Sequence, residues 1–213
     1  AAGPSVLKAL GRREYDNVIG NLREKEFTMK KIALITILIL LITLALVIVI
    51  NLYPKEINLN AQGVKYRLGI EDKKTEKLVD VNIEGKLYKS ISGKRRFTGT
   101  IDIEGEEIPF PVDQRKLNII FTNDGWGVIS YHIVEFKENG GVADIDIYQY
   151  GSIFINNDFN KVTILVSDQN QNGDTAWGAE NGQMITVPAS SRLEAISVSN
   201  ELMERFLKGY KLE

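Results

Sequence analysis

The pattern of apolar and polar positions changes three times along the chain, and the first change is the most abrupt. From Ile32 to Leu52 there are 21 residues without a charge, interrupted only by two threonines and Asn51. A helix of this length covers about 30 Å, which is the hydrocarbon thickness of a bilayer. The pattern therefore predicts a transmembrane helix over residues 32–53.

Basic residues flank this segment on one side. Arg23, Lys25, Lys30 and Lys31 precede it, whereas Lys55 alone follows closely. By the positive-inside rule, the N-terminus is cytoplasmic and the remainder is extracytoplasmic. A cleaved signal peptide is the main alternative, but its apolar core would be shorter and would end in a small-x-small cleavage site. We expect a retained single-pass anchor in the cell membrane.

Residues 1–31 are expected to form a cytoplasmic leader. Met29-Lys30-Lys31 followed by an apolar run is typical of the start of a short exported bacterial protein. Residues 1–28 are therefore interpreted either as an upstream extension or as residues that are not native to the protein. Their apolar residues are only loosely helical in spacing, and they are left out of the fold prediction.

Beyond the anchor, apolar positions alternate with polar ones, which is the period of a β-strand. Residues 54–63 are mostly polar and are predicted to be a linker. Strands are then predicted around residues 79–83, 101–103, 108–112, 117–122, 128–136, 143–150, 152–156, 161–167 and 184–187. Turn signals at 122–127, 138–141 and 156–160 separate several of them. Strands this close in sequence pair as antiparallel hairpins.

The last segment has the period of a helix, predicted over residues 191–208. Ser191 lies three residues before Glu194, which is the spacing of a capping box, and Gly209 follows the last periodic position. The apolar stripe consists of Leu193, Ile196, Asn200, Met203 and Leu207, with Leu202 and Phe206 beside it. The predicted fold class is α+β. An N-terminal transmembrane helix precedes one antiparallel β-rich domain, residues 64–213, whose C-terminal amphipathic helix covers one face of the sheet.

Composition narrows the function of the exported part. From Pro54 onward it carries 19 Lys and Arg against 24 Asp and Glu, a net charge of −5. This acidic balance argues against nucleic acid as a partner. The chain contains no cysteine, which excludes disulfides, thiol catalysis and Cys-ligated zinc.

Three stretches of the exported part carry a resemblance. They are YGSIFINNDFNKVTI (150–164), WGAENGQMITVPASSR (177–192) and EAISVSNELM (194–203). Following an N-terminal span and a DGWG turn, they resemble small membrane-anchored proteins of Gram-positive bacteria, a group without an assigned activity. The resemblance covers the exported two-thirds of the chain. It implies a location in the bacterial envelope and no functional residue.

No catalytic pattern accompanies the predicted strands. The single histidine, His132, lies within one of them, and Gly-x-Ser-x-Gly, Walker A and Gly-x-Gly-x-x-Gly patterns are absent. Asp102 with Glu104, or Asp144 with Asp146, keeps a cell-surface hydrolase using paired carboxylates open as an alternative. Alternation with Ile is, however, typical of a solvated strand face. The favoured expectation is a protein without a catalytic site.

The polar segment 168–180 contains the first half of a calcium-loop pattern. The candidate ligands are Asp168, Asn170, Asn172 and Asp174. The closing acid is out of register, because Ala179 stands where the loop needs Glu. A weak calcium site in a sensor domain and a long polar hairpin loop are the two interpretations. The second is favoured, and no other cofactor is expected.

Two features are candidates for partner contact. Lys94, Arg95 and Arg96 form a basic island suited to anionic lipid headgroups or wall polymers, with the solvated tip of a hairpin as the plainer alternative. Trp177 stands in a glycine-rich loop, where it either anchors a partner or folds back as a lid. The sequence therefore favours a membrane-anchored binding domain whose partner is another envelope protein or a wall polymer.

Overall fold

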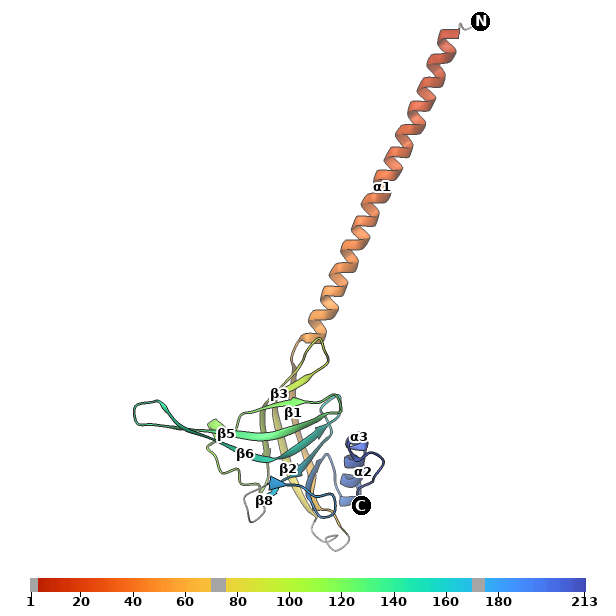
Figure 1. Ribbon diagram of the computed structural model, residues 1–213. Helices are drawn as coiled ribbons and strands as arrows, with labels where there is room; N and C mark the ends of the chain where they lie inside the picture. Colours follow the sequence, from red (N-terminus) through yellow and green to blue (C-terminus); the bar gives the residue numbers. More distant parts are fainter. Residues whose placement is uncertain (1–3, 70–75, 170–174) are drawn as a thin grey trace. The chain divides into compact units, whose positions relative to one another are not determined.

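The computed structural model describes residues 4–69, 76–169 and 175–213. The chain divides into two compact units, residues 1–51 and 52–213, and each is described by itself. The first unit consists of helix α1, Pro4–Leu52 (Figure 1). The helix begins far upstream of the apolar segment. The leader is therefore helical where the sequence predicted no element.

The apolar part of α1 has the length and composition of a membrane span. Its candidate span is Arg23–Val49, which is exposed along its length, and it is the one such helix among the described residues. The hydroxyls of Thr36 and Thr43 donate to the carbonyls of Ile32 and Leu40 at 2.9 Å each. Both hydroxyls are thus satisfied within the helix, as an apolar environment requires.

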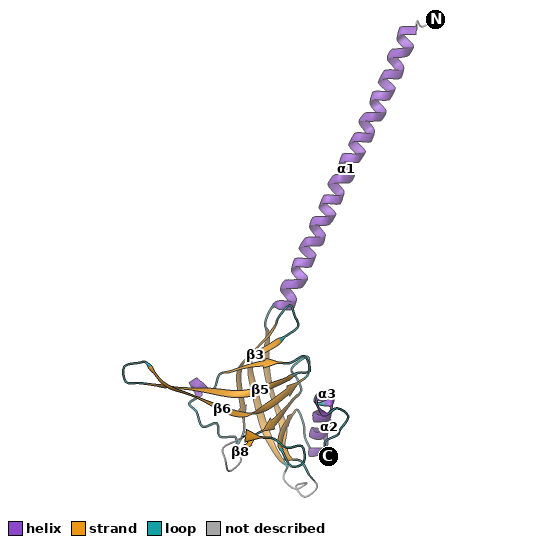
Figure 2. Ribbon diagram, in the orientation of Figure 1, coloured by secondary structure: helices purple, strands orange, loops and turns teal. Residues whose placement is uncertain are grey.

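The second unit is built on an antiparallel sheet (Figure 2). Within the described residues it has eight strands in the order β4-β3-β2-β1-β10-β7-β6-β5. Their bounds are β1 Lys55–Arg67, β2 Lys77–Lys89, β3 Arg95–Ile103, β4 Leu117–Phe121, β5 Trp126–Phe136, β6 Val142–Ile155, β7 Val162–Val166 and β10 Gln183–Val187. Two-residue strands β8, Asp168–Gln169, and β9, Thr175–Ala176, pair separately.

The two ends of the strand order approach each other. Strands β4 and β5 follow one another in the chain, and the turn between them is closed by Thr122 N–H donating to Trp126 O at 2.8 Å. A Cβ on Gly127 would lie 2.6 Å from Cγ2 of Ile119 on β4, so only glycine permits this approach. The sheet therefore curls into a nearly closed barrel.

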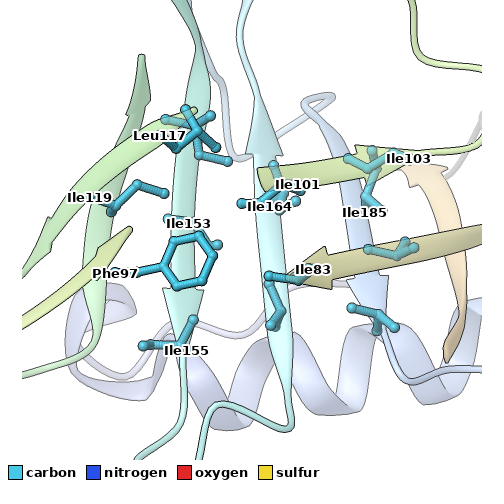
Figure 3. Packing of buried hydrophobic residues seen from close by; sticks show 14 of the residues in the cluster. Ile83, Phe97, Ile101, Ile103, Leu117, Ile119, Ile153, Ile155, Ile164 and Ile185 are labelled. Atoms are coloured by element: carbon cyan, nitrogen blue, oxygen red, sulfur yellow. The ribbon is translucent and has the colours of Figure 1, made fainter. Parts of the chain in front are cut away.

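The interior of the barrel is filled with aliphatic and aromatic side chains (Figure 3). Alternate residues of each strand point inward, as the period of a strand dictates. The labelled part of this core includes Ile83, Phe97, Ile101, Ile153, Ile164 and Ile185. The predicted alternation of Val79, Val81 and Ile83 is confirmed, since all three are buried.

A second core lies on the outer face of the barrel, beneath the C-terminal helices. These are α2, Arg192–Leu202, and α3, Glu204–Leu207. The cluster consists chiefly of Val64, Tyr66, Phe154, Leu165, Met184, Ala195, Ile196, Met203 and Leu207. Strands β1, β10, β7 and β6 therefore bury side chains on both faces, and all five residues of β7 are buried.

Four hydroxyls join the two layers of this second core. Ser199 of α2 donates to Ala195 O at 2.8 Å, as in many helices. Its oxygen lies 2.9 Å from Tyr66 OH, 2.8 Å from Thr186 Oγ1 and 3.0 Å from Thr163 Oγ1. All four residues are buried, so each hydroxyl depends on the others for its hydrogen bonds.

The predicted linker at residues 54–63 is wrong. Residues 55–63 are the first part of β1 and pair with β2 from Lys55 opposite Leu87 to Gly63 opposite Val79. Asn58, Asn60 and Gln62 face solvent and alternate with Ile57 and Leu59. The polar residues were given more weight than the alternation, although a strand with one wet face needs both.

Two predicted strand boundaries also change. Residues 108–112 do not form a strand; residues 108–111 belong to the loop that leads to the short 3-10 helix Val112–Gln114. Residues 143–150 and 152–156, predicted as two strands, form the single strand β6. Gly151 lies inside it, where a Cβ would meet Leu165 O at 2.0 Å.

The C-terminal helix is confirmed with corrections. Ser191 is the N-cap and accepts from Glu194 N–H, but Glu194 reaches back to Ser190 rather than to Ser191. The predicted helix is interrupted at Met203, which separates α2 from α3. Leu193 was predicted on the buried stripe but is 80% exposed, because the first turn of α2 presents Arg192, Ala195 and Ile196 to the sheet instead.

Candidate functional site

Strands β5 and β6 continue beyond the rest of the sheet as a two-stranded ribbon (Figure 1). Strand β7 pairs with β6 only from Gly151 to Ile155, so the preceding part of β6 is paired with β5 alone. We call residues 132–147 the arm. Its turn is held by Lys137 N–H donating to Gly141 O at 2.7 Å and Gly140 N–H donating to Lys137 O at 2.8 Å.

One face of the arm carries exposed aliphatic side chains. His132 lies opposite Ile147 and Val134 opposite Ile145, and directly opposed residues share a face of the ribbon. Ile145 is 59% and Ile147 is 60% exposed. Val134 between them is half-buried, and His132 is exposed. The arm thus presents an apolar strip to solvent. A surface that contacts only water does not require such side chains.

The backbone of the arm does not offer an open edge at these residues. Ile145 N–H donates to Oδ1 of Asp144 at 2.8 Å, and Ile147 N–H donates to Oδ1 of Asp146 at 2.7 Å. Each amide is therefore satisfied by the carboxylate that precedes it. Charged side chains on an unpaired strand are a common protection against edge-to-edge association. What the arm leaves available is its aliphatic side chains.

The root of the arm is anchored in the barrel by a polar group and an aromatic group. Glu106 forms an ion pair with Lys65 and accepts from Tyr150 OH at 2.9 Å. Burial, with the charge and hydrogen bond of Glu106, raises the pKa of Tyr150. These contacts tie β1, the loop after β3 and β6 together where the arm leaves the sheet.

Phe110 covers this end of the barrel beside two tyrosines of the arm's root. Its ring centroid lies 5.3 Å from that of Tyr148 and 6.1 Å from that of Tyr131. Burial, followed by the nearby charge of Asp102, raises the pKa of Tyr131 to about 12. The root is therefore packed and desolvated at Tyr131 and Tyr150, in contrast to the exposed ribbon beyond it.

Acidic residues of β2 and β3 gather beside this end. A cavity of about 390 Å³ is lined by Asp80, Asp102, Glu104, Arg115 and others. Glu104 N–H donates to Asp80 O at 2.9 Å, and Arg115 donates to the carbonyls of Ile108 and Phe110. The pair Asp102 and Glu104 of the hydrolase alternative does lie together here. Both carboxylates are exposed, however, whereas a catalytic acid is typically held in a desolvated site.

The second carboxylate pair, Asp144 and Asp146, lies on the exposed arm and bonds its own backbone. His132 is also exposed there, on the opposite strand. Among the residues that the structure describes, no group of three or more His, Asp or Glu side chains is arranged to hold a metal ion. The arm and the acidic cavity thus present exposed carboxylates at the surface of the barrel.

The three residues of the basic island separate into two environments. Arg95 is buried, and its Nη1 donates to Asn156 O at 3.0 Å. Burial lowers the pKa of Arg95. Lys94 and Arg96 are exposed, and the guanidinium of Arg96 lies 5.0 Å from the centre of the Tyr88 ring. The alternation of β3 explains this division, because Arg95 and Phe97 share the inward face.

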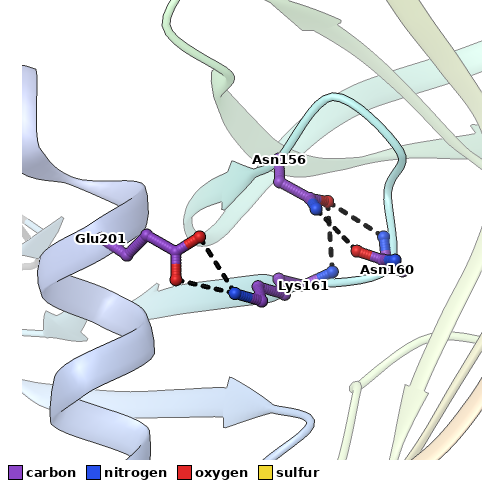
Figure 4. A network of polar contacts seen from close by, with 4 residues as sticks. All are labelled: Asn156, Asn160, Lys161 and Glu201. Atoms are coloured by element: carbon purple, nitrogen blue, oxygen red, sulfur yellow. Dashed lines mark hydrogen bonds and ion pairs between the residues drawn. The ribbon is translucent and has the colours of Figure 1, made fainter.

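Arg95 reaches a small cavity between two turns and the end of α2. The cavity measures about 250 Å³, and the charges around it are largely paired. Arg205 contacts Asp124 at 2.6 Å. Lys161 contacts Glu201 at 2.7 Å, as Figure 4 shows. Asn156 closes the turn by accepting from Asn160 N–H and Lys161 N–H (Figure 4). This network fixes the turn against α2 and is structural.

The predicted calcium segment is described only in part. Asn170, Asn172 and Asp174 lie outside the described residues. Asp168 forms a two-pronged contact with Arg67, at 3.2 Å for each oxygen. Its carboxylate is therefore already paired with a cation, and calcium binding at 168–174 stays a prediction.

Trp177 lies against the second core rather than in solvent. It is half-buried and packs beside the cluster beneath α2. A Cβ on Gly182 would lie 2.2 Å from Trp177 Nε1, so the indole rests directly on that glycine. This is the arrangement of a lid over the sheet. A role of Trp177 in partner contact stays a prediction.

The sequence missed the arm although it predicted both of its strands and the turn between them. The signal was length. The predicted strands 128–136 and 143–150 are longer than the run at 161–167, which forms the strand that pairs beside them. Long strands among short ones project past the sheet.

Comparison with known proteins gives no match from which the site could be interpreted, so its interpretation rests on its geometry. No family model, no curated protein and no solved structure matches the chain. The resemblance to membrane-anchored Gram-positive proteins therefore stays a prediction.

Proposed function

We propose that the protein is a single-pass, membrane-anchored binding module whose extracytoplasmic barrel docks a partner protein through the β5–β6 arm. The anchor is residues 32–53, supported by an exposed apolar helix of spanning length and by the basic residues that precede it. The location is the cell membrane, with the N-terminus cytoplasmic.

The observation that carries the binding role is the exposed aliphatic face of the arm. A two-stranded ribbon is marginally stable by itself in water, and this one extends past its neighbours without a covering layer. Exposed apolar patches on an otherwise polar surface mark interaction sites. Val134, Ile145 and Ile147 form such a patch on a projecting element.

The chemistry of the arm defines the class of partner. Residues 132–147 contain four acids, Glu135, Glu138, Asp144 and Asp146, against one base, Lys137. The matching surface is an apolar groove with a basic rim, which gives both burial and electrostatic steering. A groove of this kind belongs to a protein, so an envelope protein is favoured over a wall polymer.

Side-chain docking is favoured over addition of a strand to the arm. The amides of Ile145 and Ile147 already donate to Asp144 and Asp146, and a partner strand would have to displace these bonds. The arm therefore acts as an inserted ribbon whose specificity lies in its aliphatic residues. No catalytic step is needed for this role.

Site-specific photo-crosslinking in cells tests the proposal. A photoreactive amino acid at Ile147 is expected to give a discrete adduct on the full-length protein. The same amino acid at Val112, which is 76% exposed but lies outside the arm, is the matched control and is expected to give none. Ile145→Ser combined with Val134→Ser should remove the adduct from position 147 without preventing folding.

Two outcomes would contradict the proposal. One is the same set of adducts from positions 147 and 112, which would show adventitious neighbours. The other is an adduct that survives the serine substitutions, which would remove the apolar face from the interaction. The anchor is tested separately, since a C-terminal tag should stay in the membrane fraction and be cleaved by protease added to protoplasts.

A further inference from the structure

The hairpin tip between β2 and β3 lies at the end of the sheet where the chain enters it. Lys55, the first residue of β1, pairs with Leu87, and the turn from Ser90 to Lys94 extends past that pair. Only Tyr53 and Pro54 separate Lys55 from the last residue of α1. The three Cα–Cα steps from Leu52 to Lys55 span at most about 11 Å, whatever the orientation of the domain.

The tip is basic on its solvent side. From Gly85 to Thr100 the sequence contains no acid. Lys89, Lys94 and Arg96 are exposed, whereas Arg95 is directed inward. Lys86 has Glu56 at 3.9 Å, so its charge is partly compensated. Lys89, Lys94 and Arg96 therefore project from this hairpin without an ion pair to any acid in the described part of the chain.

The tip also carries the kind of side chains that enter a bilayer interface. Ile91, at the turn, is 87% exposed and is flanked by Ser90 and Ser92. The ring of Tyr88 makes a cation–π contact with the guanidinium of Arg96. Tyr88 also lines a surface cavity of about 440 Å³ beside the turn. An aliphatic residue surrounded by cations and an aromatic ring is typical of interfacial binding to anionic lipid.

The opposite end of the barrel has the opposite character. The acidic cavity of Asp80, Asp102 and Glu104 lies at the end where β2 begins and β3 finishes. The root of the acidic arm contacts the loop that follows β3, through Tyr150 and Glu106. An anionic surface attracts the tip and repels that end. The charge distribution is therefore suited to orient the domain on a membrane.

We propose that the β2–β3 tip binds the anionic lipid headgroups of the bilayer that holds α1, through Lys89, Lys94, Arg96 and Ile91. This rests on the membrane anchoring proposed above. Each basic residue near an anionic surface strengthens binding about fivefold, so the three cations together contribute roughly a hundredfold.

The absence of cysteine from the chain makes the test direct. The full-length Ile91→Cys variant is labelled with a polarity-sensitive fluorophore and reconstituted in vesicles of phosphatidylcholine, with or without phosphatidylglycerol. We expect blue-shifted emission, and quenching by headgroup spin labels, only in the anionic vesicles. Ile145→Cys, labelled in the same way on the arm, is the matched control and should report water in both.

Replacing Lys89, Lys94 and Arg96 with Gln should abolish the blue shift of the emission at position 91. High salt should also abolish this blue shift in the protein that keeps the three cations. Water-like emission at position 91 in both kinds of vesicle, from protein that floats with the lipid, would overturn the tip's role alone. A shift of equal size in both kinds of vesicle would overturn the anionic headgroup. Protein that fails to float after an alkaline wash would overturn the anchor and the tip together.

Discussion

Strand β6 has two halves that each carry two isoleucines spaced two residues apart, but the surroundings of these isoleucines are opposite. In residues 151–155, Ile153 and Ile155 point into the barrel and Phe154 points beneath α2, so both faces are buried. In residues 142–149, Ile145 and Ile147 alternate with acids, and both are more than half exposed. The difference is the neighbour: β7 ends at Val166, opposite Gly151.

Burial in this protein is therefore decided by the reach of adjacent elements and not by the pattern of one strand. Aliphatic residues in the inner half stabilise the fold, because their apolar area leaves water on folding. The same residues in the outer half contribute little to folding and leave an apolar surface for a partner. Matched substitutions along β6 and at its root separate these two roles.

The largest effect on the free energy of unfolding is expected from a substitution in the inner half of β6. Ile153 is fully buried in the barrel, so Ile153→Ala removes apolar contacts and leaves a cavity. The free energy of unfolding should fall by about 2–5 kcal/mol. Urea denaturation of the barrel domain in the full-length protein measures it. A loss below about 1 kcal/mol would mean that the interior is loosely packed.

A smaller effect is expected in the layer that covers the inner half. Ser199→Ala removes the oxygen that Tyr66 and Thr186 both contact at less than 3 Å. Because these hydroxyls are buried and lose a partner, stability should fall by about 1–3 kcal/mol. Ser197→Ala, at an exposed position of the same helix, is the control. Equal effects of the two substitutions would contradict the hydroxyl cluster.

A pH-dependent effect is expected at the boundary between the halves. Burial raises the pKa of Tyr131 to about 12, whereas the unfolded phenol ionises near about 10. The neutral phenol thus contributes stability that is present below about pH 10 and is lost as the pH rises toward 12. Tyr131→Phe should reduce the loss of stability between about pH 9 and 11, by about 1 kcal/mol. If the free energy of unfolding depends on pH to the same extent with Tyr131 and with Tyr131→Phe, the phenol is exposed to solvent and the prediction is contradicted.

The smallest effect on stability is expected in the outer half. Ile147→Ala makes the same chemical change as Ile153→Ala but at a residue 60% exposed. Stability should change by no more than about 0.5 kcal/mol. A loss of 2 kcal/mol or more, on the order of a core truncation, would show that the arm folds back onto the domain and is part of its core.

Features of the fold that depend on a few adjacent residues could be predicted from the sequence, whereas features that depend on distant contacts could not. The period of residues 79–83 and the Ser191 cap predicted a strand and a helix start correctly, because alternation and capping are properties of a few adjacent residues. The break at Met203 and the exposure of Leu193 depend on the angle at which α2 lies on the sheet, and no spacing encodes that.

The residues of the candidate site could be predicted from the sequence, but the directions and contacts of their side chains could not. The sequence placed Lys94, Arg95 and Arg96 together, but the inward direction of Arg95 follows from its pairing in the barrel. Likewise, Asp144 and Asp146 were recognised as a pair on one strand face. Their bonds to the following amides, and the exposure of the intervening isoleucines, required the ends of the neighbouring strands to be known.

Reactivity of a single cysteine on the arm is the most direct measure of whether a partner covers it in the cell. Full-length Ile147→Cys and Leu193→Cys variants, whose natural residues are 60% and 80% exposed, are treated with a membrane-impermeant maleimide on cells and as purified protein in nanodiscs. The account predicts that position 147 reacts several-fold more slowly relative to position 193 on cells than in nanodiscs, because a partner covers the arm. An unchanged ratio of the two rates would contradict it.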